Sequence, residues 1–396
     1  MKQIIKRGRF LTLMFMLLCC SSLYAADDDL ITKQITIKLE EAGTLPNKIG
    51  SNRKYQITNL KLIGEINGTD WEMIREMAGR GYSGYSTKGN LSVLDLSEAK
   101  IVKGGDSYYS GDNCYTSNDE IGNHAFDGCS GLTSLNLPAG ITSIGWNAFD
   151  GCSGLTSLNL PASITTIGVG AFSDCSGLTS LKLPAGITSI GRNAFSGCSG
   201  LTSLTIPAGI TEIGSQAFDG CSGLTSLNLP AGITSIGWNA FDGCSGLTSL
   251  NLPASITTIG VGAFSDCSGL TSLKLPASIT TIGACAFKGC SGLTSIYVYA
   301  EKVPGIDSNA FKGCDAKKCT VYVPKGTYDD YRLSVFGDYF ENIVEFEATG
   351  IDKTTTSTDV EEVVRYSVNG QRLSAPTKGL NIVKYSDGSV KKVAVE

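Results

Sequence analysis

The sequence predicts a mainly β protein built as a right-handed solenoid with a parallel sheet, an α/β N-terminal cap and a small C-terminal β module. Three observations predict the solenoid. The pattern F-x-x-C-S-G-L-T-S-L-x-L-P-A-x-I-T-x-I-G-x-x-A recurs between Phe126 and Phe311, with phenylalanines 23 residues apart until a last step of 24. Its L-x-x-L-x-L core and a period of about 20 to 29 residues are typical of leucine-rich coils. Glycine or proline every few residues excludes a long helix.

The repeats are nearly identical to one another. Residues 126–185 recur unchanged as residues 218–277, an offset of 92 residues or four repeats. A catalytic pocket in this block would exist twice, whereas a binding surface loses nothing by duplication. We therefore expect a scaffold that presents a surface, with no catalytic residue, cofactor or metal.

Residues 1–25 have the pattern of an export signal. Basic residues precede an apolar stretch at Phe10–Cys20, and the small residue Ala25 ends the segment. The apolar run is too short to span a membrane, and nothing later approaches the roughly 20 apolar residues that a transmembrane helix needs. We expect a protein that is secreted or associated with the cell surface or outer membrane. Lipid attachment at Cys19 or Cys20 is the alternative.

Residues 26–120 are expected to form the N-terminal cap. Leu60–Leu62 and Leu91–Leu96 are irregular copies of the strand pattern. Apolar residues at helical spacing over Trp71–Met77 predict an amphipathic helix that opens at Thr69-Asp70. A cap is needed because a coil without a neighbour leaves its apolar surface uncovered.

Residues 121–345 are expected to form the solenoid and its C-terminal cap. In the first full repeat Leu135 and Leu137 point inward, while Ser134 and Asn136 point outward. Equivalent strands stacked in parallel about 4.8 Å apart would form one continuous sheet roughly 40 Å long. The β-branched I-T-S-I and I-T-T-I segments predict short strand-like structure on the back of each coil.

The C-terminal part changes character in steps. Thr320–Val323 copies the repeat strand, and the aromatic, charged segment Tyr328–Phe340 could close the stack. A Thr/Ser-rich linker is expected at 346–362. Residues 363–396 then predict a small β module, because N-G and D-G turns separate strand-like runs.

The pattern L-x-x-L-x-L-P-x-x-I-x-x-I-G-x-x-A-F-x-x-C resembles the BspA-like, or Treponema-type, leucine-rich repeats of bacterial surface proteins. The phrases Ala42–Leu45, Ile66–Asp70 and Ile74–Met77 also resemble the N-terminal domain of such proteins. The resemblance covers residues 36–345 and implies export and adhesion to host proteins, other bacteria or glycans. The V-N-G-Q-R and D-G-S-V-K-K-V phrases are similar to C-terminal sorting domains of proteins from related anaerobes, and a simple terminal β module is the alternative.

A cysteine follows each repeat phenylalanine by three residues, and we expect both series to be structural. Neighbouring cysteines would lie about 4.8 Å apart, so disulfides are conceivable, but an odd number cannot pair fully. Buried free thiols that fill a tight layer are the favoured interpretation, with disulfides or a metal site as alternatives. The predicted structural ladder comprises Phe126, Phe149, Phe172, Phe195, Phe218, Phe241, Phe264 and Phe287 with Cys129, Cys152, Cys175, Cys198, Cys221, Cys244, Cys267 and Cys290.

Catalytic and metal-binding interpretations find little support. His124 is the only histidine and occupies a turn slot that other repeats fill with Asn, Gly or Gln, so we expect it to be exposed. Asp127 and Asp150 fall on adjacent coils and could together hold calcium. Solvated aspartates are the favoured interpretation, because Ser173 occupies the same slot in another repeat.

Outward strand positions and rim aromatics are the predicted binding residues. Exposed aromatic side chains are typical anchors at protein interfaces or on sugar rings, although partly buried packing is the alternative. The candidates are Ser134, Asn136, Asn159, Lys182, Thr205, Asn228, Asn251, Lys274 and Tyr297 on the strands, with Trp146 and Trp238 on the opposite rim.

Charge and composition narrow the class of partner. The net charge is -5, the sequence pI is near 5.2, and only 17% of residues are charged. Without a basic run in the mature region, nucleic acid and anionic membrane are unlikely partners on electrostatic grounds. We expect a monomer that binds an extracellular protein or glycan. A structural spacer without a ligand is the alternative, and a polysaccharide-processing enzyme would need paired carboxylates that no spacing proposes.

Overall fold

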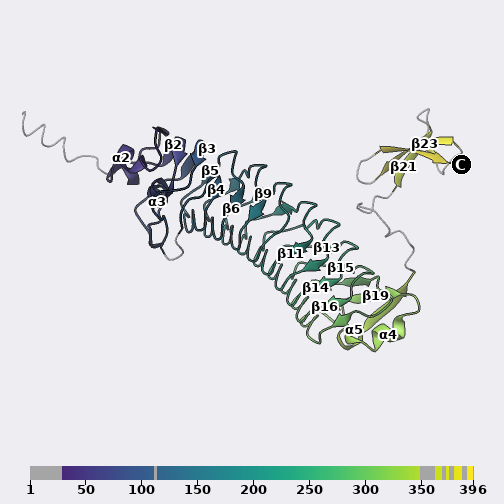
Figure 1. Cartoon of the computed structure of the whole chain (residues 1–396). Coiled ribbons are helices and arrows are strands. Elements are labelled where there is room, and N and C mark those ends of the chain that lie inside the picture. Colours follow the sequence, from purple (N-terminus) through teal and green to yellow (C-terminus); the bar gives the residue numbers. More distant parts are fainter. Residues whose placement is uncertain are drawn as a thin grey trace, which may run out of the picture. The chain divides into compact units, whose positions relative to one another are not determined.

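The computed structural model describes residues 29–110 and 114–347, and four later strands. The chain separates into two compact units, Met1–Phe346 and Glu347–Glu396. In the first unit successive coils stack with parallel strands (Figure 1), which confirms the predicted mainly β solenoid. The expected export signal at 1–25 and most of the linker at 346–362 lie outside the described residues.

The N-terminal part of the first unit pairs directly with the repeats. Strands β1 (Ile35–Leu39), β2 (Asn59–Ile66) and β3 (Val93–Ile101) are parallel and continue into β5 (Ser134–Asn136). Two short helical segments, α2 (Leu45–Ile49) and η1 (Arg53–Tyr55), separate β1 from β2.

Helix α3 (Gly68–Met77) begins with a capping box. The Asn67 side chain accepts from the Thr69 amide at 3.1 Å, and the Asp70 carboxylate accepts from the Asn67 amide at 3.0 Å. The helix therefore starts one residue before the predicted Thr69. Its Trp71 ring lies 5.3 Å from the Phe126 ring, so the helix covers the first residue of the phenylalanine series.

One face of the coils carries strands of two to five residues in register from coil to coil. The prediction of one continuous sheet is wrong, because this face consists of three separate groups of strands, the second and third joined only by isolated bridges through Asn228. Each strand is short, so a ladder contains few hydrogen bonds and a small shift interrupts it. After β5 the strands are β7 (Ser157–Leu158), β9 (Ser180–Lys182), β10 (Ser203–Thr205), β13 (Ser249–Asn251), β15 (Ser272–Leu275), β17 (Ser295–Val298), β19 (Thr320–Pro324) and β20 (Asn342–Phe346).

The back of each coil carries the second short strand expected from the β-branched segments. These strands form two parallel groups, linked by a bridge between Ile190 and Ile213. They are β4 (Glu120–Ile121), β6 (Ser143–Ile144), β8 (Thr166–Ile167), β11 (Glu212–Ile213), β12 (Ser235–Ile236), β14 (Thr258–Ile259), β16 (Thr281–Ile282) and β18 (Gly305–Ile306).

The core of the coils is a column of stacked phenylalanine rings. From Phe126 to Phe311, successive centroids lie 5.1 to 5.5 Å apart and the planes differ by 2° to 11°. The backbone follows the same column, since the Phe218 amide donates to the Ala240 carbonyl of the next coil at 2.8 Å. All these rings are fully buried. Ring stacking and hydrogen bonding thus act together between neighbouring coils.

The ladder cysteines lie beside this column as free thiols, and all are buried except Cys314, which is half-buried. Each Sγ from Cys152 to Cys314 donates to the carbonyl of the preceding coil's phenylalanine at 3.1 to 3.4 Å. Burial raises the pKa of the Cys198 thiol to about 12, which favours the protonated donor. A small group that also donates a hydrogen bond explains the repeated cysteine.

Glycines allow the coils to approach closely. A Cβ at Gly237 would lie 2.7 Å from the Ser215 amide nitrogen and 2.8 Å from the Ile213 carbonyl oxygen of the preceding coil. Real side chains do not make such contacts, so the I-G step is fixed by packing.

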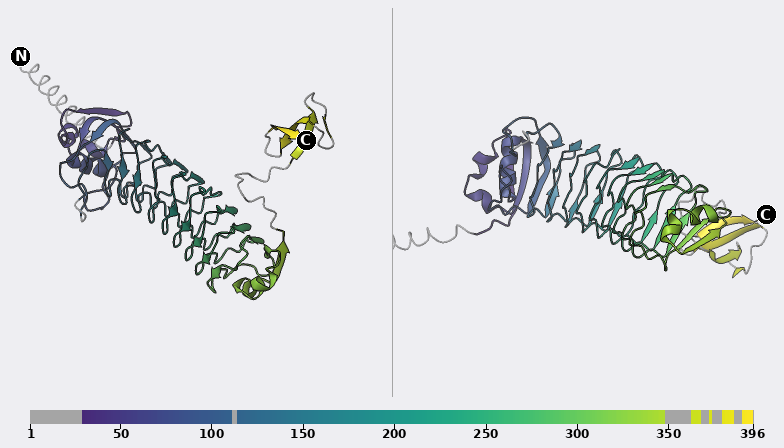
Figure 2. Two further views of the ribbon diagram at one scale, coloured as in Figure 1. Left: turned by 45° about the vertical axis from the view of Figure 1, so that its right-hand side comes forward. Right: turned by 90° about the horizontal axis from the view of Figure 1, so that it is seen from below.

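The C-terminal end of the first unit covers the last ring. Helices α4 (Tyr328–Arg332) and α5 (Val335–Tyr339) lie between β19 and β20, at the opposite end of the coils from α2 and α3 (Figure 2). Phe336 and Phe340 contact the Phe311 ring at 5.4 and 5.3 Å. The segment predicted to close the stack therefore packs on its end.

The second unit contains a four-stranded antiparallel sheet in the order β22-β21-β23-β24. The predicted turns at Asn369-Gly370 and Asp387-Gly388 lie outside the described residues. The strands are β21 (Glu362–Ser367), β22 (Arg372–Leu373), β23 (Gly379–Tyr385) and β24 (Val390–Val395).

Within the part of the chain that the structure describes, no helix has the length and apolar character required to cross a membrane.

Candidate functional site

The outward strand positions form a polar surface that we call the strand face. It combines a row of serines with a row of variable residues two positions further along each strand, and an inward leucine lies between them. These side chains are small or flexible and offer many hydrogen-bonding groups. The exposed candidates are Ser134, Asn136, Asn159, Lys182, Thr205, Asn228, Asn251 and Lys274.

Tyr297 differs from the other strand-face candidates because it is half-buried in an aromatic cluster. Its ring stacks on Tyr322 at 4.5 Å, and the Phe346 ring meets it edge-on at 6.1 Å. Tyr299 meets the same Phe346 at 5.3 Å. The sequence pattern singled out only Tyr297, because Phe346 comes from the irregular last strand and carries no periodic signal.

The tryptophans lie on the rim row, which we define as Trp146, Val169, Arg192, Ser215, Trp238, Val261 and Ala284. Trp146 is 61% exposed and Trp238 is 52% exposed, and Val169 and Val261, one coil further on in each case, are also exposed. The carbonyl groups of this row accept amides from the preceding coil, for example His124 to Trp146 at 2.8 Å and Gln216 to Trp238 at 2.7 Å. The large apolar side chains therefore project from a fixed backbone.

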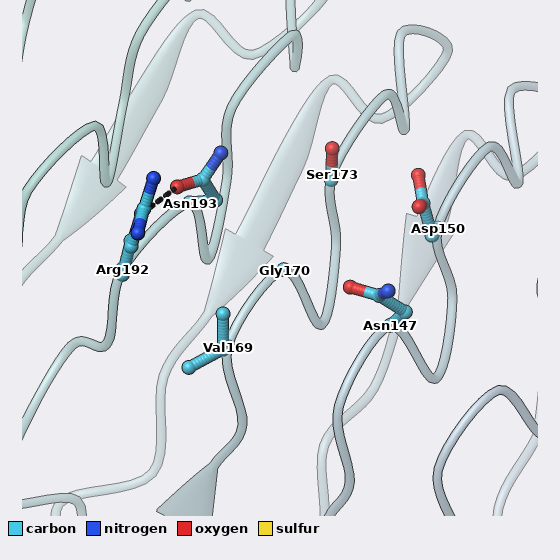
Figure 3. A pocket seen from close by; sticks show the side chains of 7 residues that line it. All are labelled: Asn147, Asp150, Val169, Gly170, Ser173, Arg192 and Asn193. Carbon is cyan, nitrogen blue, oxygen red and sulfur yellow. Dashed lines mark hydrogen bonds between the residues drawn. The ribbon is translucent and has the colours of Figure 1, made fainter. Parts of the chain in front are cut away.

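A pocket of about 310 Å³ lies beside the first half of the rim row (Figure 3). Three successive coils contribute to it. Asp150 and Ser173 were considered from the sequence in connection with calcium, but no pocket was predicted here. The signal that could have found it lies in the rim row, where Arg192 replaces the apolar residue of the neighbouring coil. The lining residues are Asn147, Asp150, Val169, Gly170, Ser173, Arg192 and Asn193.

The electrostatics of this edge vary along the coils. Burial, with the neighbouring carboxylates of Asp127 and Asp174, raises the pKa of Asp150 to about 6. Burial also acts on Asp127, but hydrogen bonds from His124 and Tyr109 outweigh it and lower its pKa. The carboxyl groups of Asp150 and Asp127 therefore gain their charge in different pH ranges.

His124 occupies the predicted turn, with φ of 55°, but the expectation that it is exposed is wrong. Its side chain is 13% exposed, the ring stacks on Tyr109 at 4.5 Å, and Nδ1 lies 3.0 Å from the Asp127 carboxylate. Tyr109 comes from the irregular N-terminal region, so the repeat pattern gave no sign of it.

Among the described residues, no group of three or more His, Cys, Asp or Glu side chains is placed to hold a metal ion. The geometry of the described residues instead offers polar rows, exposed aromatic side chains and the polar pocket at Arg192. Such an arrangement can bind a partner through many contacts on a rigid scaffold.

These features define the protein as a leucine-rich repeat solenoid with a repeated polar surface. The family model of the BspA type leucine rich repeat region matches the chain in six copies, over residues 113–225 and 188–318. Together these matches cover just over half of the sequence. The chain therefore belongs to the BspA-type leucine-rich repeat family.

Matches among solved structures include a leucine-rich repeat protein of T. pallidum, at 28% identity and a TM-score of 0.26; the match covers 36% of this chain and 58% of that one. A leucine-rich cell surface protein of Faecalibacterium prausnitzii matches at 23% identity over 80% of this chain and 88% of that one, with a TM-score of 0.37. The pneumococcal vaccine antigen PcpA matches at 17% identity over 82% and 91%, with a TM-score of 0.41. Comparison with curated proteins gave no match.

Proposed function

We propose that this protein is exported to the cell surface or secreted, and that it mediates adhesion or macromolecular binding through its repeat face. The expected partner is an extracellular protein or glycan. Membership of the BspA-type family supports a general role in protein binding or adhesion. The basic and apolar pattern of residues 1–25 supports export.

The observation that carries the proposal is the exposure of Trp146 and Trp238 on the rim row. Tryptophan is enriched among the residues that contribute most to interfaces, and a fixed backbone lowers the entropy lost on binding. The two residues are four coils apart, or about 19 Å at the spacing of parallel strands. One extended partner can therefore engage both, which raises the overall affinity.

Binding to an array of immobilised extracellular-matrix proteins, bacterial cells and glycans tests this function. We expect saturable binding to at least one class, and a loss of about tenfold or more in the double variant Trp146→Ala, Trp238→Ala. The matched control is Leu333→Ala, since Leu333 is 88% exposed but lies between α4 and α5, away from the rim row. Equal binding by wild type and the double variant would contradict the assignment.

A structural spacer is the second candidate function. The identity of residues 126–185 with residues 218–277 favours it, because copying four coils lengthens a scaffold without creating a new site. A spacer predicts no saturable ligand anywhere on the array.

Protease accessibility on intact cells tests export separately. The proposal predicts that added protease degrades the protein while a cytoplasmic marker stays intact. We also propose that the C-terminal β module acts in sorting, and its deletion should then retain the protein inside the cell.

A further inference from the structure

The pocket beside the rim row has ends of opposite charge. Asp150 and Asn147 lie at one end, Arg192 and Asn193 at the other, and the coil of Gly170 runs between them (Figure 3). The two ends are two coils apart, or about 10 Å at the strand spacing. A ligand that fills the pocket must therefore satisfy an acceptor at one end and a cation at the other.

Arg192 retains unused hydrogen-bonding capacity. Its Nε donates to Asn193 Oδ1 at 3.2 Å and Nη2 donates to Gln216 Oε1 at 3.4 Å, both neutral acceptors and both long. Among the ion pairs of the described residues, none includes Arg192. A guanidinium has five N–H donors and pairs most strongly with a planar carboxylate. The positive end is thus open to an anionic group.

The rest of the lining suits hydroxyl groups. Asn147 and Asn193 each offer an amide donor and acceptor, Ser173 offers a hydroxyl, and Asp150 offers acceptors. Trp146, which is exposed, directly precedes the lining residue Asn147 in the sequence. Several hydrogen-bonding side chains close together, with an aromatic ring nearby, are typical of sites that bind the hydroxyl groups and the apolar face of a sugar.

We propose that this pocket binds an acidic sugar residue of a glycan, with the sugar carboxylate on Arg192 and its hydroxyls on the Asn147, Asn193 and Asp150 side chains. This inference rests on the proposed binding function and assigns a ligand class to one part of the repeat face. A singly charged carboxylate fits better than a phosphate monoester, because Asp150 would repel the greater negative charge of the phosphate. A peptide carboxylate would pair with Arg192 but leave the hydroxyl-binding groups without partners.

Most of the lining residues recur later in the chain, which provides an internal control. At the offset of 92 residues, Asn147, Asp150, Val169, Gly170 and Ser173 recur unchanged as Asn239, Asp242, Val261, Gly262 and Ser265. The end that holds Arg192 differs, because Ala284 replaces Arg192 and Cys285 replaces Asn193, and outside the lining Lys288 replaces Ser196. The second set of residues therefore keeps the hydroxyl-binding groups and lacks the guanidinium, so we expect one acidic-sugar site per chain.

Exchange of these two positions tests the proposal in full-length protein. The probe is a hyaluronan oligosaccharide, which alternates glucuronic acid with N-acetylglucosamine, and the neutral control is a chitin oligosaccharide of equal length. Calorimetry should give one hyaluronan site in wild type. Arg192→Ala with Asn193→Cys should weaken binding at least about tenfold, as expected for loss of a charged hydrogen bond, and Ala284→Arg with Cys285→Asn should give two sites.

Three results would overturn the assignment: equal binding of the two oligosaccharides, unchanged hyaluronan affinity in the Arg192 double variant, or binding of acidic peptides but not sugar. Arg192→Gln, which keeps length and polarity, gives a second test if the double variant unfolds. If hyaluronan does not bind while array binding still depends on Trp146 and Trp238, the acidic-sugar site is wrong and the adhesion function stands.

Discussion

Truncation of one ring in the phenylalanine column should destabilise the whole stack. Phe218 is fully buried and lies between Phe195 at 5.3 Å and Phe241 at 5.1 Å. Phe218→Ala removes two stacked contacts and leaves a cavity that the coils above and below cannot close, because backbone hydrogen bonds fix their spacing. Core Phe→Ala changes cost about 3–5 kcal/mol, and each ring pair accounts for about 0.5–1.5 kcal/mol of this.

Urea unfolding, followed by tryptophan fluorescence and circular dichroism, measures the effect. We expect a loss of about 4 kcal/mol in the free energy of unfolding for Phe218→Ala. Phe218→Leu should lose only about 1–2 kcal/mol, because most of the apolar volume remains. The exposed control Leu333→Ala should stay within about 0.5 kcal/mol of wild type. A loss below about 1 kcal/mol for Phe218→Ala would refute the stacked core.

Further predictions concern the backbone, one carboxyl group and the thiols. Gly237→Ala should destabilise by about 1–3 kcal/mol because its Cβ meets the preceding coil, whereas Gly131→Ala, with nothing within 4 Å of the added Cβ, should be nearly neutral in the same urea assay. The folded-state pKa of Asp150 is about 6, against 3.8 for an ordinary aspartate, so this group favours folding below pH 4 and loses that contribution as pH rises through 6. Asp150→Asn should therefore be more stable than wild type by about 1 kcal/mol at pH 7.5, a value that allows for solvent screening of this half-buried group. At pH 3.5 the two proteins should be equally stable. If the difference in unfolding free energy between variant and wild type were the same at both pH values, the reasoning would be wrong. Thiol titration of unreduced protein should detect the ladder cysteines only after denaturation, and extensive disulfide pairing there would overturn the free-thiol core.

The periodic part of the fold could be predicted closely from sequence, because each repeat reports the same local environment many times. The strand at Ser134–Asn136, the back strand at Ser143–Ile144 and the phenylalanine column all follow from one pattern. The helix start was predicted to within one residue, because Asn67 and Asp70 form a local capping box.

Contacts between irregular segments could not be predicted, since they have no period. Tyr109 covers His124, and Phe346 joins the aromatic cluster at Tyr297, from regions outside the repeats. The interruptions of the strand pairing on the strand face could not be predicted either, because identical local sequences occur in segments that pair and in segments that do not. The polar pocket depends on Arg192, a departure from the repeat that becomes informative only when the coils are seen side by side.

Excision of four coils tests most directly the claim that the repeats form a stack of equivalent units. Deletion of residues 126–217 joins Ala125 to Phe218 and restores the native junction sequence, because residues 218–277 are identical to residues 126–185. Every remaining coil keeps the same type of neighbour. We predict a shorter protein that still unfolds cooperatively in urea, with an m-value lower by roughly a quarter because less surface is exposed on unfolding. An unfolded or aggregated product would contradict the account.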